Sequence, residues 1–160
     1  MTNNIQIREF GKEDIDTVVA LIHQVVDISY RDVYPAAALN LYKEFHCRDN
    51  ILNDAENGYC VVAENSDRIV GTGTLLDDGI RRVYIDPSYQ KSGIGKRIYR
   101  ELEHKALKTG LSRLGLGASD IAREFWESVG FVFEEEVDIP AGNEQLKFYM
   151  MSKQLSGTGG

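Results

Sequence analysis

The fold of this chain is decided by one stretch of its sequence, Val83-Tyr84-Ile85-Asp86-Pro87-Ser88-Tyr89-Gln90-Lys91-Ser92-Gly93-Ile94-Gly95-Lys96. The stretch predicts a strand that stops at Pro87, because proline cannot donate to a strand ladder. A short loop follows, and a helix is expected from about Gly93 to Lys108. A strand, a glycine-containing loop and a helix in this order are suited to binding a phosphate group.

The loop offers what a phosphate site needs. Gly93 and Gly95 let a ligand approach the backbone without meeting a Cβ atom. The first amide groups of a helix have no acceptor within it, and that end of the helix is positively polarised. Lys91 and Lys96 add mobile positive charge. We therefore expect residues 90–96 to bind an anionic cofactor.

Two other phosphate-binding loops do not fit this spacing. A Walker loop needs glycine five residues before Gly95, where this chain has Gln90. A Rossmann fingerprint needs a third glycine, and Ile98 stands at that position. The residues alone also allow an ordinary glycine-rich connection between a strand and a helix.

Hydrophobic periodicity predicts the remaining elements. Residues 5–10 alternate as a strand, and from Glu13 the apolar residues recur at helical spacing. A second helical region of less definite extent follows Pro35, and Asp120 is expected to cap a helix that ends at Val129. Further strands are expected at 59–64, 69–76, 80–86, 112–117, 131–135 and 146–152, the last two joined by a loop that contains Pro140 and Gly142. The order β-α-α-β-β-β-α-β-α-β-β predicts a mixed α/β domain.

The fourth strand contains an irregularity. Val83 and Ile85 share one face, but Ile80 is an odd number of residues away and would point to the other face of a regular pleat. A β-bulge near Arg81 and Arg82 would restore the phase, and bulges often occur beside active sites. The alternative is that Ile80 packs on the opposite covered face.

Length and composition favour one globular domain. The chain has 160 residues, 42% of them hydrophobic, and we expect a domain over residues 1–155 and a flexible tail at 156–160. The sequence shows neither a signal-peptide pattern nor an apolar run that could span a membrane, so a cytoplasmic protein is expected.

Charge and cysteine content exclude several functions. The formal net charge of −7 argues against binding to DNA or RNA, which depends on neutralising phosphates, and is compatible with a cationic substrate. Cys47 and Cys60 lack metal-ligand spacing, and the three histidines are isolated. We expect neither a disulfide framework nor a metal site.

Two motifs resemble those of the GCN5-related N-acetyltransferase (GNAT) superfamily. Gln90-x-x-Gly93-x-Gly95 is similar to the family's (Q/R)-x-x-G-x-(G/A) signature, and here it follows a strand that ends in Asp86-Pro87. Ala122-x-x-Phe125-Trp126-x-x-x-Gly130-Phe131 is similar to the family's A-x-x-F-Y-x-x-x-G-F segment. The order of the elements agrees from about Ile5 to Lys153.

The resemblance implies a mostly antiparallel mixed sheet with helices on both faces. It implies that this sheet splays open between strands 80–86 and 112–117, and that acetyl-CoA lies in the opening. Pantetheine would pair with the backbone edge of residues 83–85, the pyrophosphate would sit on residues 90–95, and the acetyl carbonyl would accept a backbone hydrogen bond near Tyr84 or Ile85. The cofactor-binding residues expected on this basis are Val83, Tyr84, Ile85, Gln90, Lys91, Ser92, Gly93, Ile94, Gly95, Lys96, Ser119 and Trp126.

The chain departs from the family pattern at its familiar polar positions. Trp126 stands where a tyrosine often acts as acid, Ser119 where an asparagine is common, and Gly79 where a glutamate is often found. We therefore assign the general base to Asp78, through a water molecule, and name Tyr149 as a candidate acid. The alternatives are that Asp78 is only a solvated turn residue and that Tyr149 only packs against its neighbours.

The implied activity is direct attack of a primary amine on the thioester of acetyl-CoA. Asp27, Tyr30 and Tyr34 form an acidic and aromatic group that could bind a small-molecule amine through charge and cation–π contact, although a solvated helix end is the alternative. Other functions left open are acetylation of proteins or peptides and a catalytically silent acyl-CoA-binding module. A homodimer is also left open.

Overall fold

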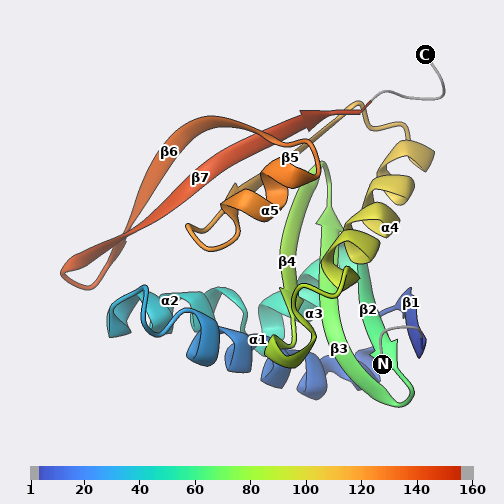
Figure 1. Ribbon diagram of the computed structural model, residues 1–160, viewed down its shortest axis with the longest axis horizontal. Helices are drawn as coiled ribbons and strands as arrows, with labels where there is room; N and C mark the ends of the chain where they lie inside the picture. The colour runs from blue at the N-terminus through green and yellow to red at the C-terminus, as the bar shows by residue number, and fades with distance from the viewer. Residues whose placement is uncertain (1–3, 156–160) are drawn as a thin grey trace.

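The computed structural model describes residues 4–155, and the tail expected at 156–160 lies outside this range. Its centre is a seven-stranded sheet with the order β1-β2-β3-β4-β5-β7-β6 (Figure 1). All neighbouring strands are antiparallel except β4 and β5, which are parallel. The mixed, mostly antiparallel sheet implied by the resemblance is therefore confirmed.

The elements follow the expected order with one addition. The strands are β1 (Ile5–Glu9), β2 (Tyr59–Asn65), β3 (Arg68–Leu76), β4 (Gly79–Ile85), β5 (Arg113–Ala118), β6 (Val132–Ala141) and β7 (Glu144–Gln154). The α-helices are α1 (Ile15–Ser29), α2 (Ala36–Phe45), α3 (Arg48–Asn57), α4 (Ile94–Lys108) and α5 (Arg123–Ser128), and short 3-10 turns cover η2 (Lys12–Asp14) and η3 (Pro87–Tyr89).

Helix α3 is the addition, and sequence periodicity missed it. The helix is mostly polar and offers few apolar residues for a helical stripe, with Ile51 the buried one. Its other buried residue is Asp54, whose carboxylate is held by arginines of β4. An ion pair from a distant strand therefore fixes this helix, and periodicity carries no signal for such a contact.

Of the two alternatives for β4, the bulge is confirmed. The pairing of β4 with β3 shifts at Gly73, because Tyr84 lies opposite Thr72 while Arg81 lies opposite Thr74. Arg82 takes a left-handed backbone conformation with φ of 56° at this point. The extra residue brings Ile80 onto the same face as Val83 and Ile85, where all three contribute to one core.

Helices cover both faces of the sheet, as the resemblance implied (Figure 1). One core lies under α4 and α5 and includes Ile98, Leu102 and Trp126. The other lies under α1 and α2 and includes Ile22 and Tyr42. Because β4 has both faces covered, its side chains alternate between the two cores.

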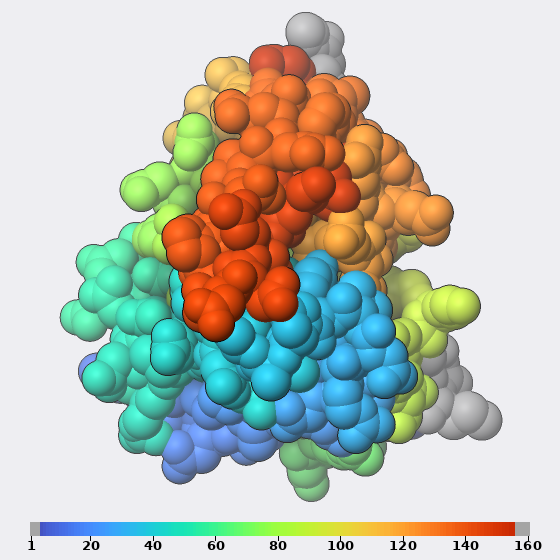
Figure 2. All heavy atoms as spheres, turned by 90° about the vertical axis from the view of Figure 1, so that its left-hand side faces the viewer, coloured from blue at the N-terminus to red at the C-terminus, as the bar shows by residue number. Residues whose placement is uncertain are grey.

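Two expectations near the C-terminus are corrected. Pro140 belongs to β6, where it pairs with Gln145, and not to a loop; β6 is the edge strand of the sheet, where a missing N–H costs no ladder hydrogen bond. Helix α5 begins at Arg123 after Ala122, so Asp120 is not its cap. Figure 2 shows the β6–β7 hairpin reaching onto α2, where Gly142 lies against Ala37.

Candidate active site

The candidate active site is the opening between β4 and β5. These strands pair at a single position, Gly79 with Gly115, beside a hydrogen bond from Gly115 N to Asp78 O of 2.9 Å. Beyond this point they diverge and border a cavity of about 950 Å³. Its walls come from α2, α3, β4, β5, α5 and the β6–β7 hairpin, so residues far apart in the sequence meet there.

The backbone of β4 presents hydrogen-bonding groups to this opening. Asp86 N donates to Val70 O at 2.8 Å, which shows that this residue faces β3. Successive residues of a strand alternate in direction, so Tyr84 also faces β3, while Val83 and Ile85 face the opening. Ile85 O accepts a hydrogen bond of 3.1 Å from Gln90 Nε2, in agreement with this alternation. Of the two residues expected to donate to an acetyl carbonyl, Ile85 therefore has its N–H on the correct side.

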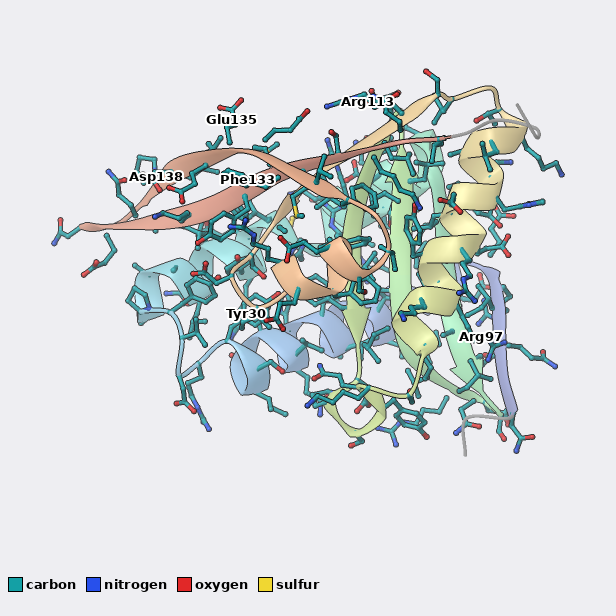
Figure 3. All side chains as sticks on the ribbon, turned by 45° about the horizontal axis from the view of Figure 1, so that its top comes forward. Tyr30, Arg97, Arg113, Phe133, Glu135 and Asp138 are labelled. Carbon is teal, nitrogen blue, oxygen red and sulfur yellow. The ribbon has the colours of Figure 1, made fainter. Side chains whose placement is uncertain are left out.

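The loop after β4 leads into the free end of α4. The first bond within the helix is from Arg97 N to Gly93 O, at 3.1 Å, so the amides of residues 94–96 have no intrahelical acceptor. Lys91 and Lys96 are exposed beside them, and Ser92 Oγ donates to Tyr89 O. The side chain of Ile94 is buried in the core, so this residue offers only its backbone to a ligand. Arg97 instead donates to Ile5 O at 2.9 Å and ties α4 to β1 (Figure 3).

The two glycines of the loop have different roles. Gly93 has φ of +88°, and a Cβ atom added there would meet nothing within 4 Å, so its open side is available to a ligand. A Cβ atom added to Gly95 would lie 3.2 Å from the Phe125 ring. Gly95 therefore allows α5 to pack closely on α4, a role that the sequence did not indicate.

Ser119 and Trp126 both line the cavity, but they belong to different surroundings. Ser119 Oγ lies 3.3 Å from the Tyr30 hydroxyl, and this contact joins the end of β5 to the end of α1. Trp126 is only 6% exposed and packs edge to face against the rings of Tyr99, Phe125 and Phe131. The tryptophan is therefore a core residue with one edge at the cavity.

The expected catalytic residues lie in different places. Asp78 is exposed in the turn before β4 and lines the cavity where the two strands meet. Tyr149 is not among the described residues that line the cavity, and its ring packs against Phe133 and beneath the Arg123 guanidinium. The proposed base thus borders the opening, whereas the candidate acid lies away from it.

The expected substrate residues are only partly brought together. Tyr30 is buried and lines the cavity, and the Tyr34 ring packs 5.6 Å from it. The Tyr34 hydroxyl accepts a hydrogen bond of 3.1 Å from Asp120 N. Asp27 is exposed outside the cavity lining and forms an ion pair of 2.5 Å with Lys43. The aromatic part of this group therefore faces the site, and its carboxylate does not.

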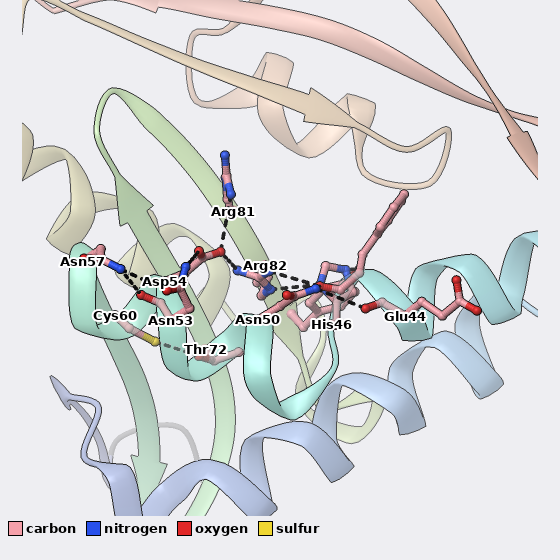
Figure 4. A network of polar contacts seen from close by, with 12 residues as sticks. Glu44, His46, Asn50, Asn53, Asp54, Asn57, Cys60, Thr72, Arg81 and Arg82 are labelled. Carbon is pink, nitrogen blue, oxygen red and sulfur yellow. Dashed lines mark hydrogen bonds and ion pairs between the residues drawn. The ribbon is translucent and has the colours of Figure 1, made fainter.

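Sequence reasoning missed a chain of partly buried polar contacts along the wall of the cavity (Figure 4). Asp54 of α3 pairs with Arg82, whose Nε donates to His46 Nδ1 at 3.0 Å. His46 Nε2 lies 2.9 Å from the Tyr84 hydroxyl. The only indication in the sequence was that Ile80 is out of phase with Val83 and Ile85 in the alternation of β4. This irregularity marks the bulge that turns the Arg82 side chain inward.

The chain of contacts fixes the protonation of its members. Burial, and then the charge of Arg82, lower the pKa of His46 to about 3, so the imidazole is neutral near pH 7. Arg82 Nε can only donate, so His46 Nδ1 accepts and the single ring proton is on Nε2. Burial would raise the pKa of Asp54, but the hydrogen bond and charge of Arg82 lower it on balance.

None of the helices in residues 4–155 has the length and the apolar composition that a membrane-spanning helix requires. Across the same part of the chain, no three His, Cys, Asp or Glu side chains are grouped so that they could hold a metal ion.

Comparison with known proteins identifies the family. The sequence model described as an acetyltransferase (GNAT) domain matches residues 27–155. A GCN5-related N-acetyltransferase from Rhodopseudomonas palustris has a similar structure, with a TM-score of 0.86 and 22% identity over 94% of this chain and 95% of that one. The PaiA N-acetyltransferase of Thermoplasma acidophilum, solved with coenzyme A, has a TM-score of 0.77 and 19% identity over 94% of this chain and 99% of that one.

A third similar structure is the ribosomal-protein-S18-alanine N-acetyltransferase of Escherichia coli. Its TM-score is 0.72, with 15% identity over 96% of both chains. These structures share the fold, and the match to the domain model covers most of the sequence. The splayed sheet, the free end of α4 and this match together show that the chain belongs to the GNAT family of acetyltransferases.

Proposed function

We propose that this protein transfers the acetyl group of acetyl-CoA to a primary amine of a small molecule, in a complex that holds both reactants at once. The observation that carries this proposal is the β4–β5 opening, which joins a free helix end for a phosphate to a free backbone edge for a pantetheine arm. The cytoplasm remains the proposed compartment.

The residues expected to hold acetyl-CoA fit its chemistry. The amides of residues 94–96 and the open side of Gly93 suit a pyrophosphate, with Lys91 and Lys96 beside them. Val83 and Ile85 offer backbone groups to an amide-containing arm in the manner of a strand edge. Acetyl-CoA supplies an acetyl thioester, which an amine can attack directly.

Each protein group then has a proposed task. The Ile85 N–H donates to the acetyl oxygen and stabilises negative charge that develops there; a donor of this kind contributes about 3–4 kcal/mol where its removal has been measured. Asp78 accepts the ammonium proton of the incoming amine through water. The two walls of the opening hold the amine and the thioester close together, which removes much of the entropic barrier.

A thiol-release assay tests this function. The protein is incubated with acetyl-CoA and, in turn, polyamines, aminoglycosides, amino acids and peptides, and free coenzyme A is measured. Release that depends on one class of amine is expected, and Gly93→Asp should abolish it because a carboxylate would occupy the open side of Gly93. Release with peptides only would support a peptide acetyltransferase. Binding of acetyl-CoA without release over the whole panel would support a silent acyl-CoA-binding module.

A further inference from the structure

The floor of the cavity contains a buried hydroxyl group without a partner. Tyr42 is 3% exposed and lines the cavity, and its hydroxyl is the one buried side-chain polar atom of residues 4–155 that makes no hydrogen bond. Leaving such a group unsatisfied costs about 1–3 kcal/mol, so a position of this kind needs an explanation. A ligand that hydrogen-bonds to the hydroxyl when it occupies the cavity would supply one.

The Tyr84 hydroxyl also lines the cavity, and its contact with His46 fixes the direction in which it donates its proton. Because the His46 ring proton is on Nε2, that nitrogen donates to the Tyr84 oxygen. The Tyr84 proton therefore points away from His46, toward the side of the cavity where the Tyr30 hydroxyl also interacts with it. Burial raises the pKa of Tyr84 and of Tyr42 well above that of a free phenol, so both remain donors at neutral pH.

The charged side chains that line the cavity balance overall, but the positive charge is in excess on the wall next to Tyr84. On the wall formed by α3 and β4, Arg81 and Arg82 both pair with the single carboxylate of Asp54, which leaves one net positive charge. Arg113 and Glu134 on the opposite side form their own ion pair of 3.0 Å. Asp78, the remaining carboxylate of the lining, lies in the turn where β4 begins.

Aromatic rings surround the two hydroxyls. The Tyr42 ring lies 5.0 Å from that of Tyr30 and 5.8 Å from that of Phe148, and Phe45 and His46 complete this part of the lining. Such walls suit the apolar body of a small ligand, while the hydroxyls suit a group that accepts hydrogen bonds.

We propose that the acceptor is an amine that also carries a carboxylate, as an amino acid with an apolar side chain does, and that its carboxylate accepts hydrogen bonds from the Tyr42 and Tyr84 hydroxyls. This inference rests on the proposed acetyl-transfer function and narrows its substrate class. In this proposal Asp27 no longer binds the amine of the substrate, because the Asp27 carboxylate is paired with Lys43 outside the cavity lining.

A matched pair of acceptors tests the proposal. Thiol release is measured with free phenylalanine and with phenethylamine, which is the same amine without the carboxylate. The wild-type protein should prefer phenylalanine in kcat/KM. Tyr42→Phe should lower kcat/KM for phenylalanine by about 10- to 100-fold, the range for one hydrogen bond to a charged group, and leave phenethylamine unchanged. Tyr84→Phe should likewise lower kcat/KM for phenylalanine.

Thermal unfolding separates this effect from misfolding. Tyr42→Phe removes an unsatisfied hydroxyl, so its Tm should equal or exceed that of the wild type. Tyr59→Phe is the matched control, because the Tyr59 hydroxyl donates to Glu101 at 2.9 Å and the residue is not part of the cavity lining. It should leave kcat/KM for both acceptors unchanged.

Three outcomes would overturn the inference. One is equal use of both acceptors by the wild type, or a preference for phenethylamine, which would favour recognition of a cation by the aromatic rings. Another is an equal loss with both acceptors in Tyr42→Phe. The third is no release with either acceptor although acetyl-CoA binds. Failure to bind acetyl-CoA would instead refute the proposed function itself.

Discussion

Trp126 offers a sharp test of how the site is built, because it replaces the tyrosine that is usual in the family pattern. The indole is 94% buried against three aromatic rings, so we predict that Trp126→Ala costs about 3–5 kcal/mol of unfolding free energy. For a chain of this length each kcal/mol shifts Tm by about 2–4 °C, which gives a fall of roughly 6–20 °C. Trp126→Phe keeps one ring and should lose less.

The expected effect of Trp126→Ala on the cofactor is much smaller. The exposed 6% of the side chain corresponds to roughly 15 Å² of a total near 250 Å². At about 25 cal/mol per Å² this contact is worth ~0.4 kcal/mol, or about a twofold change in Kd. Trp126→Tyr should keep or raise kcat by supplying a phenol near the leaving group, since an indole N–H stays protonated at ordinary pH and cannot act as an acid.

Calorimetric titration with acetyl-CoA and thermal unfolding are measured on the same three variants. A fall in Tm together with nearly unchanged affinity of the folded protein is the predicted result. A Trp126→Ala variant that keeps the wild-type Tm but binds acetyl-CoA more than tenfold more weakly would refute the reasoning, because the indole would then be a ligand contact and not a core residue.

Three further predictions concern the loop, the base and the partly buried His46. Gly93→Ala should cost about 1–2 kcal/mol from its left-handed backbone alone, whereas Gly93→Asp should also abolish acetyl-CoA binding in a titration; equal binding by the two variants would contradict the phosphate assignment. Asp78→Asn should lower kcat/KM by ~10²–10⁴-fold at neutral pH, with a loss that shrinks at high pH, where the amine arrives deprotonated; a loss independent of pH would assign the proton to another group. The pKa of His46 is lowered to about 3 in the folded state against about 6.5 in the unfolded state, so the unfolded state binds more protons between these values. The free energy of unfolding should therefore fall with decreasing pH, by about 2 kcal/mol from pH 7.5 to pH 5 in urea titrations, and His46→Gln should flatten this slope.

The sequence predicted the parts of the fold that local patterns determine. The strand, loop and helix around Gly93 were recognisable because a proline stop, two glycines and a helical stripe all occur within a few residues. The bulge in β4 could be anticipated because Ile80 is out of phase with Val83, and the pairing with β3 confirms it. Each of these signals lies within one element.

The acceptor side of the cavity could not be predicted, because it is assembled from distant elements. His46, Arg82 and Tyr84 lie up to 38 residues apart and meet only when the C-terminal end of α2 lies against β4 in the folded chain. In the sequence, Tyr42 is only one more apolar position of a helix. Its hydroxyl becomes informative once the structure shows that it is buried without a hydrogen-bond partner. The packing role of Gly95 was missed for the same reason, since the Phe125 ring that lies against it comes from another helix.

The central claim, acetyl transfer from acetyl-CoA to an amine, is tested most directly with isotope-labelled acetyl-CoA. The protein is incubated with cofactor labelled in its acetyl group and with free phenylalanine among a panel of amines, and the products are analysed by mass spectrometry. The account predicts the label in an amide of one acceptor, with none in the parallel reaction of Gly93→Asp. Label found only in unreacted acetyl-CoA or in free acetate, with every amine unmodified, would contradict it.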